Sequence, residues 1–254
     1  MQFPMNEQVK WNPEEKIIGV VGVAPAATAD FYHKLIQLTP AKKDWQHVRV
    51  IIDSNPKIPS RGRYLELGEA DPVPYICQSI ESLYQMGASI IAVPCNTAHI
   101  LYERYAADFP VIIPDMIEVT RSATLRRCGK TLRSVVVFAS KLTKQYRLYE
   151  KAFAGFQVSL LDTERYQADI SNLIEKVKQG YSVISLYDQI NQICSVYKNA
   201  DAFILGCTEL SLLVSDHFEG IPVIDSNQAL AEACLVLSKN DIFNRQYSRE
   251  GVYS

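Results

Sequence analysis

The stretch SIIAVPCNTAH at residues 89–99 runs from a short apolar segment directly into Cys95 and a group of polar residues. A second stretch, AFILGCTEL at residues 202–210, repeats this pattern around Cys207. About fifteen residues beyond each cysteine the pair Pro-Val recurs, at residues 110–111 and 222–223, and Asp115 or Asp225 follows shortly after. Repetition of this kind indicates duplicated structural units. The two halves of the chain are therefore predicted to be related.

Apolar runs of strand length recur on both sides of these cysteines and alternate with segments of helical period. We expect strands at residues 17–23, 48–52, 89–93 and 111–113 in the first half, and at 134–139, 157–161, 202–205 and 222–224 in the second. Strands that are apolar throughout are typical of parallel sheets covered by helices on both faces. The sequence therefore predicts an α/β protein of three layers with mainly parallel sheets.

The domain organisation follows from the duplication, because no low-complexity linker separates the two halves. The first boundary is expected near residues 114–116, and the chain is expected to cross back near Asp225. This predicts a first domain at residues 1–115, completed by residues 225–254, and a second domain at residues 116–224.

The composition excludes several classes of partner. The 254 residues are 48% hydrophobic and carry a formal net charge of −2, without the basic footprint that a nucleic-acid-binding surface needs. The longest weakly polar run, residues 17–29, is too short to cross a bilayer. The first sixteen residues contain three glutamates and no apolar signal-peptide core. We therefore expect a cytoplasmic protein with neither nucleic acid nor membrane as a partner.

Six cysteines are too few in a chain of this length to indicate a disulfide scaffold. Cys77 lies among apolar residues at helical spacing, and Cys128, Cys194 and Cys234 also fall in expected helices, so these four are predicted to be packing residues. No pair of cysteines, or of cysteine and histidine, has zinc-ligand spacing. No metal is expected.

Cys95 and Cys207 differ from the other four, because each ends an apolar strand and precedes a residue that can begin a helix. Ligands of open α/β sheets bind at the carboxyl ends of strands, and a helix N-terminus lowers the pKa of a thiol, so a thiolate near neutral pH is expected. Two thiols on opposite faces of a carbon suit stereoinversion without a cofactor, because one removes the α-proton and the other delivers a proton from the far side. A single nucleophilic cysteine would instead need a histidine held nearby, and His99 is the nearest in sequence.

Four segments together carry a resemblance to a known family: GVAPAATADFYHKLIQLTP at residues 22–40, IIDSNPKIPSRGRYL at 51–65, VPCNTAH at 93–99 and GCTEL at 206–210. In order and spacing they resemble the diagnostic stretches of the aspartate/glutamate racemase superfamily, with the aspartate racemase branch the nearest. The likeness extends from about Lys16 to Leu237. It implies two pseudosymmetric α/β domains with the active site in the cleft between them, a homodimer, and no pyridoxal phosphate.

The resemblance also implies roles for individual residues. Cys95 and Cys207 become the two catalytic acid/bases. Three neighbours of these cysteines become ligands of the substrate α-carboxylate: Asn96, Thr97 and Thr208. Simple helix capping is the alternative for the two threonines. Arg61 resembles the family's basic residue for a second carboxylate, which favours aspartate or glutamate. Asn55 is expected to point into the cleft, and Thr28 matches the family pattern.

Two segments depart from the family pattern. The first loop has VGVAP at residues 21–25 where the family reads close to GGMGP, so Ala24 adds a Cβ where the backbone approaches a ligand. The segment FASKLTKQYRLYEKAF at residues 138–153 lacks the small residues often found there and contains four cations, three of which are candidates to face the cleft. These are Lys141, Lys144 and Arg147, of which Arg147 is taken as a substrate-binding residue. Glu209 and His99 either orient a thiol or the substrate ammonium, or lie on a helix surface.

These observations favour a cofactor-independent racemase that interconverts L- and D-aspartate, or glutamate, by a two-base mechanism with both cysteines. A related isomerase such as maleate isomerase is an alternative, because covalent attack by one cysteine on an alkene is compatible with the same pair. The altered first loop leaves a third possibility open, which is a catalytically weak amino-acid-binding or regulatory protein.

Overall fold

The computed structural model describes residues 14–214 and 217–240 and contains two sheets. The first sheet has the order β2-β1-β3 and consists of β1 (Ile17–Gly22), β2 (Val50–Ser54) and β3 (Ala88–Ala92). The second has the order β5-β4-β6-β8-β7 and consists of β4 (Ser134–Ala139), β5 (Ser159–Leu161), β6 (Ala202–Gly206), β7 (His217–Phe218) and β8 (Ile221–Asp225). Within the described residues the strands pair in parallel, apart from β7 with β8. The predicted α/β fold with mainly parallel sheets is confirmed.

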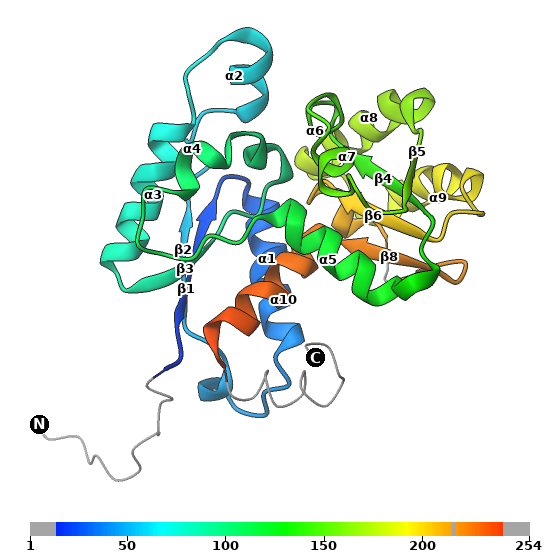
Figure 1. Cartoon of the computed structure of the whole chain (residues 1–254). Coiled ribbons are helices and arrows are strands. Elements are labelled where there is room, and N and C mark those ends of the chain that lie inside the picture. The colour runs from blue at the N-terminus through cyan, green and yellow to red at the C-terminus, as the bar shows by residue number, and fades with distance from the viewer. Residues whose placement is uncertain (1–13, 215–216, 241–254) are drawn as a thin grey trace, which may run out of the picture.

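Helices connect and cover these strands (Figure 1). The α-helices are α1 (Pro25–Leu38), α2 (Arg61–Leu67), α3 (Val73–Gln85), α4 (Glu103–Ala106), α5 (Met116–Cys128), α6 (Lys141–Gln145), α7 (Leu148–Ala152), α8 (Gln167–Lys178), α9 (Tyr187–Val196) and α10 (Ser226–Ser238). Short 3-10 turns are η1 (Asp44–Gln46), η2 (Asn96–Leu101), η3 (Gly129–Thr131), η4 (Glu164–Tyr166), η5 (Val183–Leu186) and η6 (Leu210–Leu212). None of the described helices combines the length and the apolarity that a bilayer span requires.

Each sheet separates two apolar cores, which is what makes both halves three-layered. In the first half Val21 of β1 packs with Ile80 of α3 on one face, whereas Val20 packs with Phe31 of α1 and Leu230 of α10 on the other. Successive side chains of a strand point to opposite faces, so a continuously apolar strand supplies both cores.

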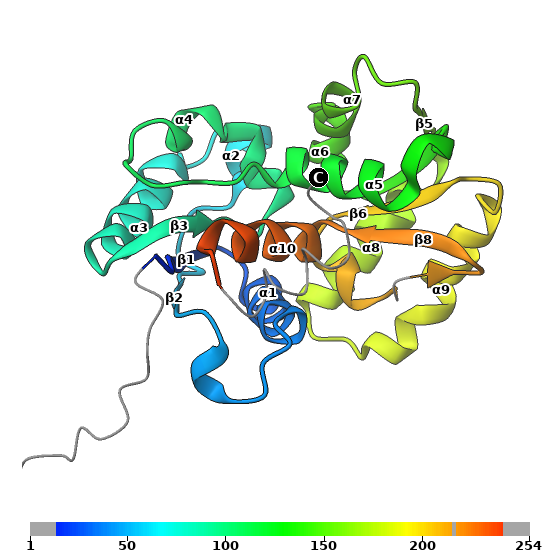
Figure 2. The same ribbon diagram turned by 60° about the horizontal axis from the view of Figure 1, so that its bottom comes forward.

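The second half repeats this arrangement with different helices. Phe138 of β4 packs with Ile170 of α8 on one face, and Val137 packs with Ile117 of α5 on the other. The two lobes meet along α1, α5 and α10, and Figure 2 shows α10 lying between them. The domain boundaries near residues 115 and 225 stay a prediction, and residues 1–13 and 241–254 of the predicted first domain lie outside the described residues.

The duplicated sequence pattern has a duplicated local structure. Asp115 precedes α5 and accepts a hydrogen bond of 2.8 Å from the backbone N–H of Ile117. Asp225 precedes α10 and accepts one of 2.8 Å from the N–H of Asn227. Both aspartates therefore cap the helix that follows the Pro-Val segment of their own half.

One strand prediction is wrong, and one short strand was missed. Residues 111–113 form only an isolated bridge between Ile112 and Ile90, because Pro110 and Pro114 flank the segment, and a proline cannot donate a ladder hydrogen bond. The β7 strand was not predicted. It pairs with β8 through Glu219 and Gly220, which both have positive φ angles, 48° and 86°, as a tight two-residue hairpin requires.

Candidate active site

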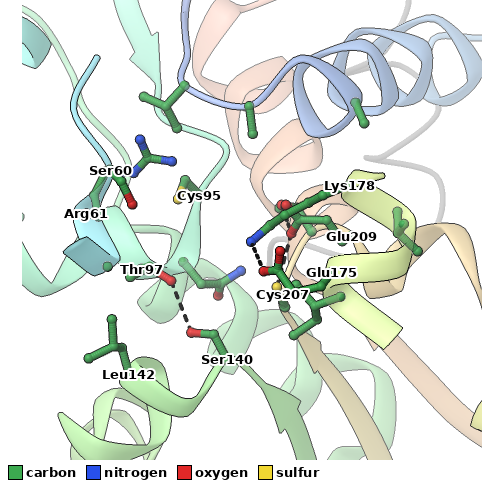
Figure 3. Close-up of a pocket in the computed structure, with 18 of the residues that line it drawn as sticks. Ser60, Arg61, Cys95, Thr97, Ser140, Leu142, Glu175, Lys178, Cys207 and Glu209 are labelled. Atoms are coloured by element: carbon green, nitrogen blue, oxygen red, sulfur yellow. Dashed lines mark hydrogen bonds and ion pairs between the residues drawn. The ribbon is translucent and has the colours of Figure 1, made fainter. Parts of the chain in front are cut away.

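A cavity of about 840 Å³ lies between the two halves of the molecule. Its walls come from the segments that follow β1, β2 and β3 of the first sheet and β4 and β6 of the second, together with the C-terminal part of α8 (Figure 3). Ligand sites of open α/β sheets occupy this position, outside the carboxyl ends of the strands. The fold therefore brings the loops of both sheets to one cleft.

Cys95 and Cys207 both line this cleft. Cys95 is half-buried and precedes η2, and its backbone N–H donates to the Val93 carbonyl at 2.7 Å. Cys207 directly follows β6 and is buried, with 8% of its surface exposed. Figure 3 shows the two sulfur atoms on different walls of the pocket. The predicted convergence of the two cysteines is thus present in the structure.

The Cys207 thiol is held by a neighbouring carboxylate. Its Sγ donates to Glu209 Oε2 at 3.1 Å, and the hydroxyl of Thr208 lies 3.3 Å from the same oxygen. Burial raises the pKa of the Cys207 thiol well above its ordinary value, and the charge and hydrogen bond of Glu209 raise it further. Cys207 is therefore a protonated thiol in the resting protein.

The expectation that a helix N-terminus lowers the pKa of Cys207 is wrong. The turn nearest to it, η6, contains only Leu210–Leu212, and so short a turn has few aligned peptide dipoles. Loss of water around the sulfur and the nearby carboxylate both act in the opposite direction and dominate.

Thr97 and Thr208 both lie in the lining of the cleft. Thr97 Oγ1 is 3.1 Å from Ser140 Oγ, which in turn is 3.0 Å from Thr143 Oγ1. Ser140 also caps α6 and lines the cleft, although the sequence reasoning did not single it out. The available signal was its place directly after β4, which corresponds to the places of the cysteines after β3 and β6.

Asn96 lines the cleft, but its side chain is already engaged. Its Oδ1 accepts a hydrogen bond of 2.7 Å from the Tyr149 hydroxyl, and its Nδ2 donates one of 2.9 Å to Ser226 Oγ. Within the part of the chain that the structure describes, the second N–H of this amide has no hydrogen-bond partner.

Two cations enter the pocket from opposite walls (Figure 3). Arg61 begins α2 and donates to the Pro59 carbonyl at 3.2 Å, and its buried Nε has no hydrogen-bond partner among the described residues. Lys178 ends α8, and its Nζ lies 2.8 Å from Glu175 Oε1. Burial alone would lower the pKa of Lys178, but the carboxylates of Glu175 and Glu209 outweigh it and raise the pKa. Lys178 is therefore a cation at neutral pH.

Lys178 and Glu175 were missed in the sequence, because they lie on the polar face of an amphipathic helix with no motif around them. Of the three candidate cations in residues 138–153, Lys141 is the one among the described residues that line the cleft. Its Nζ lies 3.7 Å from Glu66 Oε1 of α2. Lys144 pairs with Glu164 at 3.1 Å.

Three predicted binding residues are not among the described residues that line the cleft: Thr28, Asn55 and Arg147. Thr28 is buried in α1, where its hydroxyl donates to the Ala24 carbonyl at 2.8 Å. The Asn55 side chain accepts from the N–H of Lys57 at 3.1 Å and so shapes its own loop. Arg147 is exposed, with φ of 56°, and precedes α7. The structure does not bring these three side chains to the site.

Ala24 does line the cleft, whereas His99 does not. His99 is buried and stacked on Tyr102, with Nδ1 3.0 Å from the Cys95 carbonyl oxygen, and burial lowers its pKa. The other four cysteines are in or against the apolar cores, as predicted, namely Cys77, Cys128, Cys194 and Cys234.

Comparison with known proteins gives a consistent set of similarities. The family model described as Asp/Glu/Hydantoin racemase matches residues 19–234. The broad specificity amino-acid racemase RacX of Bacillus subtilis (strain 168) is 27% identical over 230 residues, which cover 85% of this chain and 96% of the relative. Glutamate racemase of Aquifex aeolicus (strain VF5) is 28% identical over 200 residues, which cover 69% of this chain and 73% of the relative. Among solved structures, the aspartate racemase of Picrophilus torridus has a TM-score of 0.80 at 27% identity, covering 90% and 99% of the two chains.

Proposed function

The chain belongs to the Asp/Glu/hydantoin racemase family, and on that premise we propose that it interconverts the L and D enantiomers of an acidic amino acid, with aspartate as the first candidate and glutamate as the second. The proposed reaction uses Cys95 and Cys207 as its two acid/base groups and needs no pyridoxal phosphate. The observation that carries the proposal is the convergence of two cysteines from duplicated strand ends on one cleft.

In the proposed mechanism the two cysteines act from opposite faces of the substrate α-carbon. In one direction Cys207, whose thiol is held by Glu209, is the proton donor, and Cys95 is the base. Cys95 takes the α-proton, the electron pair of the C–H bond stays on the substrate as a carbanion, and Cys207 delivers its own proton to the other face. The product has the opposite configuration, and the protonation states of the two cysteines have been exchanged.

The cleft offers complementary groups for an acidic amino acid. We propose that the hydroxyls of Thr97, Ser140 and Thr208, with backbone N–H groups and the remaining N–H of Asn96, bind the α-carboxylate. Arg61 and Lys178 provide positive charge for the side-chain carboxylate from the two walls of the cleft. Glu175 or Glu209 is available for the substrate ammonium.

The test is incubation of each enantiomer of aspartate and glutamate with the protein in D2O. The expected result is deuterium at the α-carbon and loss of optical purity, measured by NMR and chiral chromatography. Absence of exchange with all four compounds contradicts the proposal. Conversion of maleate to fumarate instead would identify the isomerase alternative, and calorimetric binding of an amino acid without turnover would identify the binding protein.

The proposal extends to a homodimer located in the cytoplasm. Sedimentation of the purified protein and fractionation of cells that produce it test these two points.

A further inference from the structure

Tyr149 lies between the turns that carry the two cysteines. It belongs to α7 and is buried, with 1% of its surface exposed. Its ring packs on Gly206, the residue before Cys207, so closely that a Cβ added at Gly206 would lie 2.7 Å from ring atom Cε2. Its hydroxyl donates to Oδ1 of Asn96, the residue after Cys95, at 2.7 Å. One side chain therefore contacts both cysteine turns.

A second arm joins the same two turns through Ser226, the first residue of α10. The Asn96 amide donates to Ser226 Oγ at 2.9 Å, and Ser226 Oγ donates to the Leu205 carbonyl at 2.7 Å, two residues before Cys207. The Asn96 amide is thus held at both ends by groups that contact the second cysteine turn. Tyr149, Asn96 and Ser226 thus form a hydrogen-bonded link between the two cysteine turns, which we call the bridge.

All three side chains of the bridge are buried. Asn96 and Ser226 are almost inaccessible to solvent, and a buried polar group that loses its partner is not compensated by water. Burial raises the pKa of Tyr149, so the phenol stays a neutral donor at all physiological pH values. The hydroxyl can therefore act as a constant support for Asn96.

Two-base inversion depends on the relative placement of the two sulfur atoms, because both must reach the same carbon. The reacting atoms must approach to about 3–3.5 Å on both faces of one carbon, and a displacement of about 1 Å can cost roughly a hundredfold in rate. We propose that Tyr149 is a positioning residue, which fixes the two cysteine turns relative to each other through the bridge. The proton delivered by one cysteine can then reach the carbon that the other has deprotonated. This inference rests on the proposed function.

The Tyr149→Phe variant tests this role, because it keeps the ring on Gly206 and removes only the hydroxyl. Proton abstraction needs one cysteine in place, whereas inversion needs both. In D2O the abstracting thiol exchanges its proton with solvent and can return deuterium to the same face, which yields a deuterated substrate of unchanged configuration. We expect kcat for inversion to fall about tenfold or more, KM to change less, and the ratio of exchange to inversion to rise several-fold.

Tyr197→Phe is the matched control. Tyr197 lies in the same half of the chain, is not among the cleft-lining residues, and its hydroxyl makes one hydrogen bond of 2.8 Å, to the Asp162 carbonyl. This variant also loses one tyrosine hydroxyl bond, and its exchange-to-inversion ratio should equal that of the wild type.

Ser226→Ala removes the other arm of the bridge. If both arms act through the Asn96 amide, the effects of Tyr149→Phe and Ser226→Ala on the ratio should be less than multiplicative in the double variant. Multiplicative effects would contradict a shared route through Asn96.

Labelling of Cys95 by iodoacetamide, followed by mass spectrometry, examines the bridge without turnover. Tyr149→Phe should increase the labelling rate several-fold, and Tyr197→Phe should leave it unchanged. A wild-type protein without any exchange would overturn the proposed function, while the labelling result would still test the bridge. The positioning role alone would be overturned if the wild type exchanges normally but Tyr149→Phe has an unchanged exchange-to-inversion ratio and an unchanged rate of Cys95 labelling.

Discussion

Cys207 Sγ donates a hydrogen bond of 3.1 Å to Glu209 Oε2 within the buried wall of the cleft. Burial and this carboxylate together raise the pKa of Cys207. A two-base racemase needs one thiol and one thiolate before each turnover. Under the proposed mechanism this pair makes Cys207 the proton donor of the resting protein and leaves Cys95 as the base for the first substrate molecule.

Glu209→Gln should lower the pKa of Cys207, because it removes a negative charge that opposes thiolate formation. The profile of iodoacetamide labelling at Cys207 should therefore move to lower pH, and racemisation should slow by roughly tenfold or more as the donor is lost. For the labelling profile Glu175→Gln is the control, since this carboxylate also lines the cleft but is paired with Lys178 and does not act on the Cys207 pKa. An unmoved profile in Glu209→Gln would contradict the role given to this carboxylate.

Arg61→Ala and Lys178→Ala should each weaken the use of acidic substrates. Hydrogen bonds to charged groups contribute about 1.5–3 kcal/mol, which corresponds to a loss in kcat/KM of roughly ten- to a hundredfold. Lys176→Ala is the control, because Lys176 lies on α8 but is not among the described residues that line the cleft, and its kcat/KM should stay near that of the wild type. The measurement is steady-state racemisation of aspartate, and an Arg61→Ala variant with wild-type kcat/KM would argue against its role as a carboxylate ligand.

Lys34 is expected to stabilise the junction of α1 and β8. It forms ion pairs with Asp30 and, at 2.7 Å, with Asp225, and all three side chains are largely buried. Lys34→Met leaves two buried carboxylates without their cation, so we expect a loss of roughly 3–5 kcal/mol in the free energy of unfolding. Arg63→Ala, which breaks the exposed pair with Glu69, should leave the Tm unchanged.

The pH dependence of this ion pair has a definite sign. Burial alone would lower the pKa of Lys34, but Asp225 and Asp30 outweigh it and raise the pKa above the ordinary 10.5. The stabilisation is therefore fully present below about pH 10.5 and is lost as the pH rises through the higher folded-state value. Urea unfolding at several alkaline pH values should show the wild type approaching Lys34→Met, and a constant gap would contradict this assignment.

The sequence predicted most of the sheet architecture because the strands are apolar on both faces. It wrongly predicted a full strand at residues 111–113. The apolar side chains there suit a strand, but the flanking prolines cannot extend the hydrogen-bond ladder. It missed β7, because two residues are too few to show any periodicity. Backbone hydrogen bonding decides both cases, and side-chain patterns report it only indirectly.

The sequence predicted those site residues that directly follow a strand, because the carboxyl ends of the strands lie at the cleft. The residues directly after β3 and β6 reach the cleft, including Cys95, Thr97 and Cys207. Lys178 could not be predicted, because it comes from the far end of a connecting helix. Thr28, Asn55 and Arg147 had suitable chemistry but satisfy local hydrogen bonds or face solvent instead. The raised pKa of Cys207 also depends on burial, which the sequence around it does not show.

Cys95→Ser and Cys207→Ser, assayed in D2O with each enantiomer of aspartate separately, test the central claim most directly. Each variant should lose racemisation by roughly a hundred- to ten-thousandfold, because one of the two acid/base groups is gone. Each should still exchange the α-proton of one enantiomer, and the two variants should retain opposite enantiomers. Racemisation near the wild-type rate in either variant, or retained exchange of the same enantiomer by both, would contradict a two-base mechanism with Cys95 and Cys207.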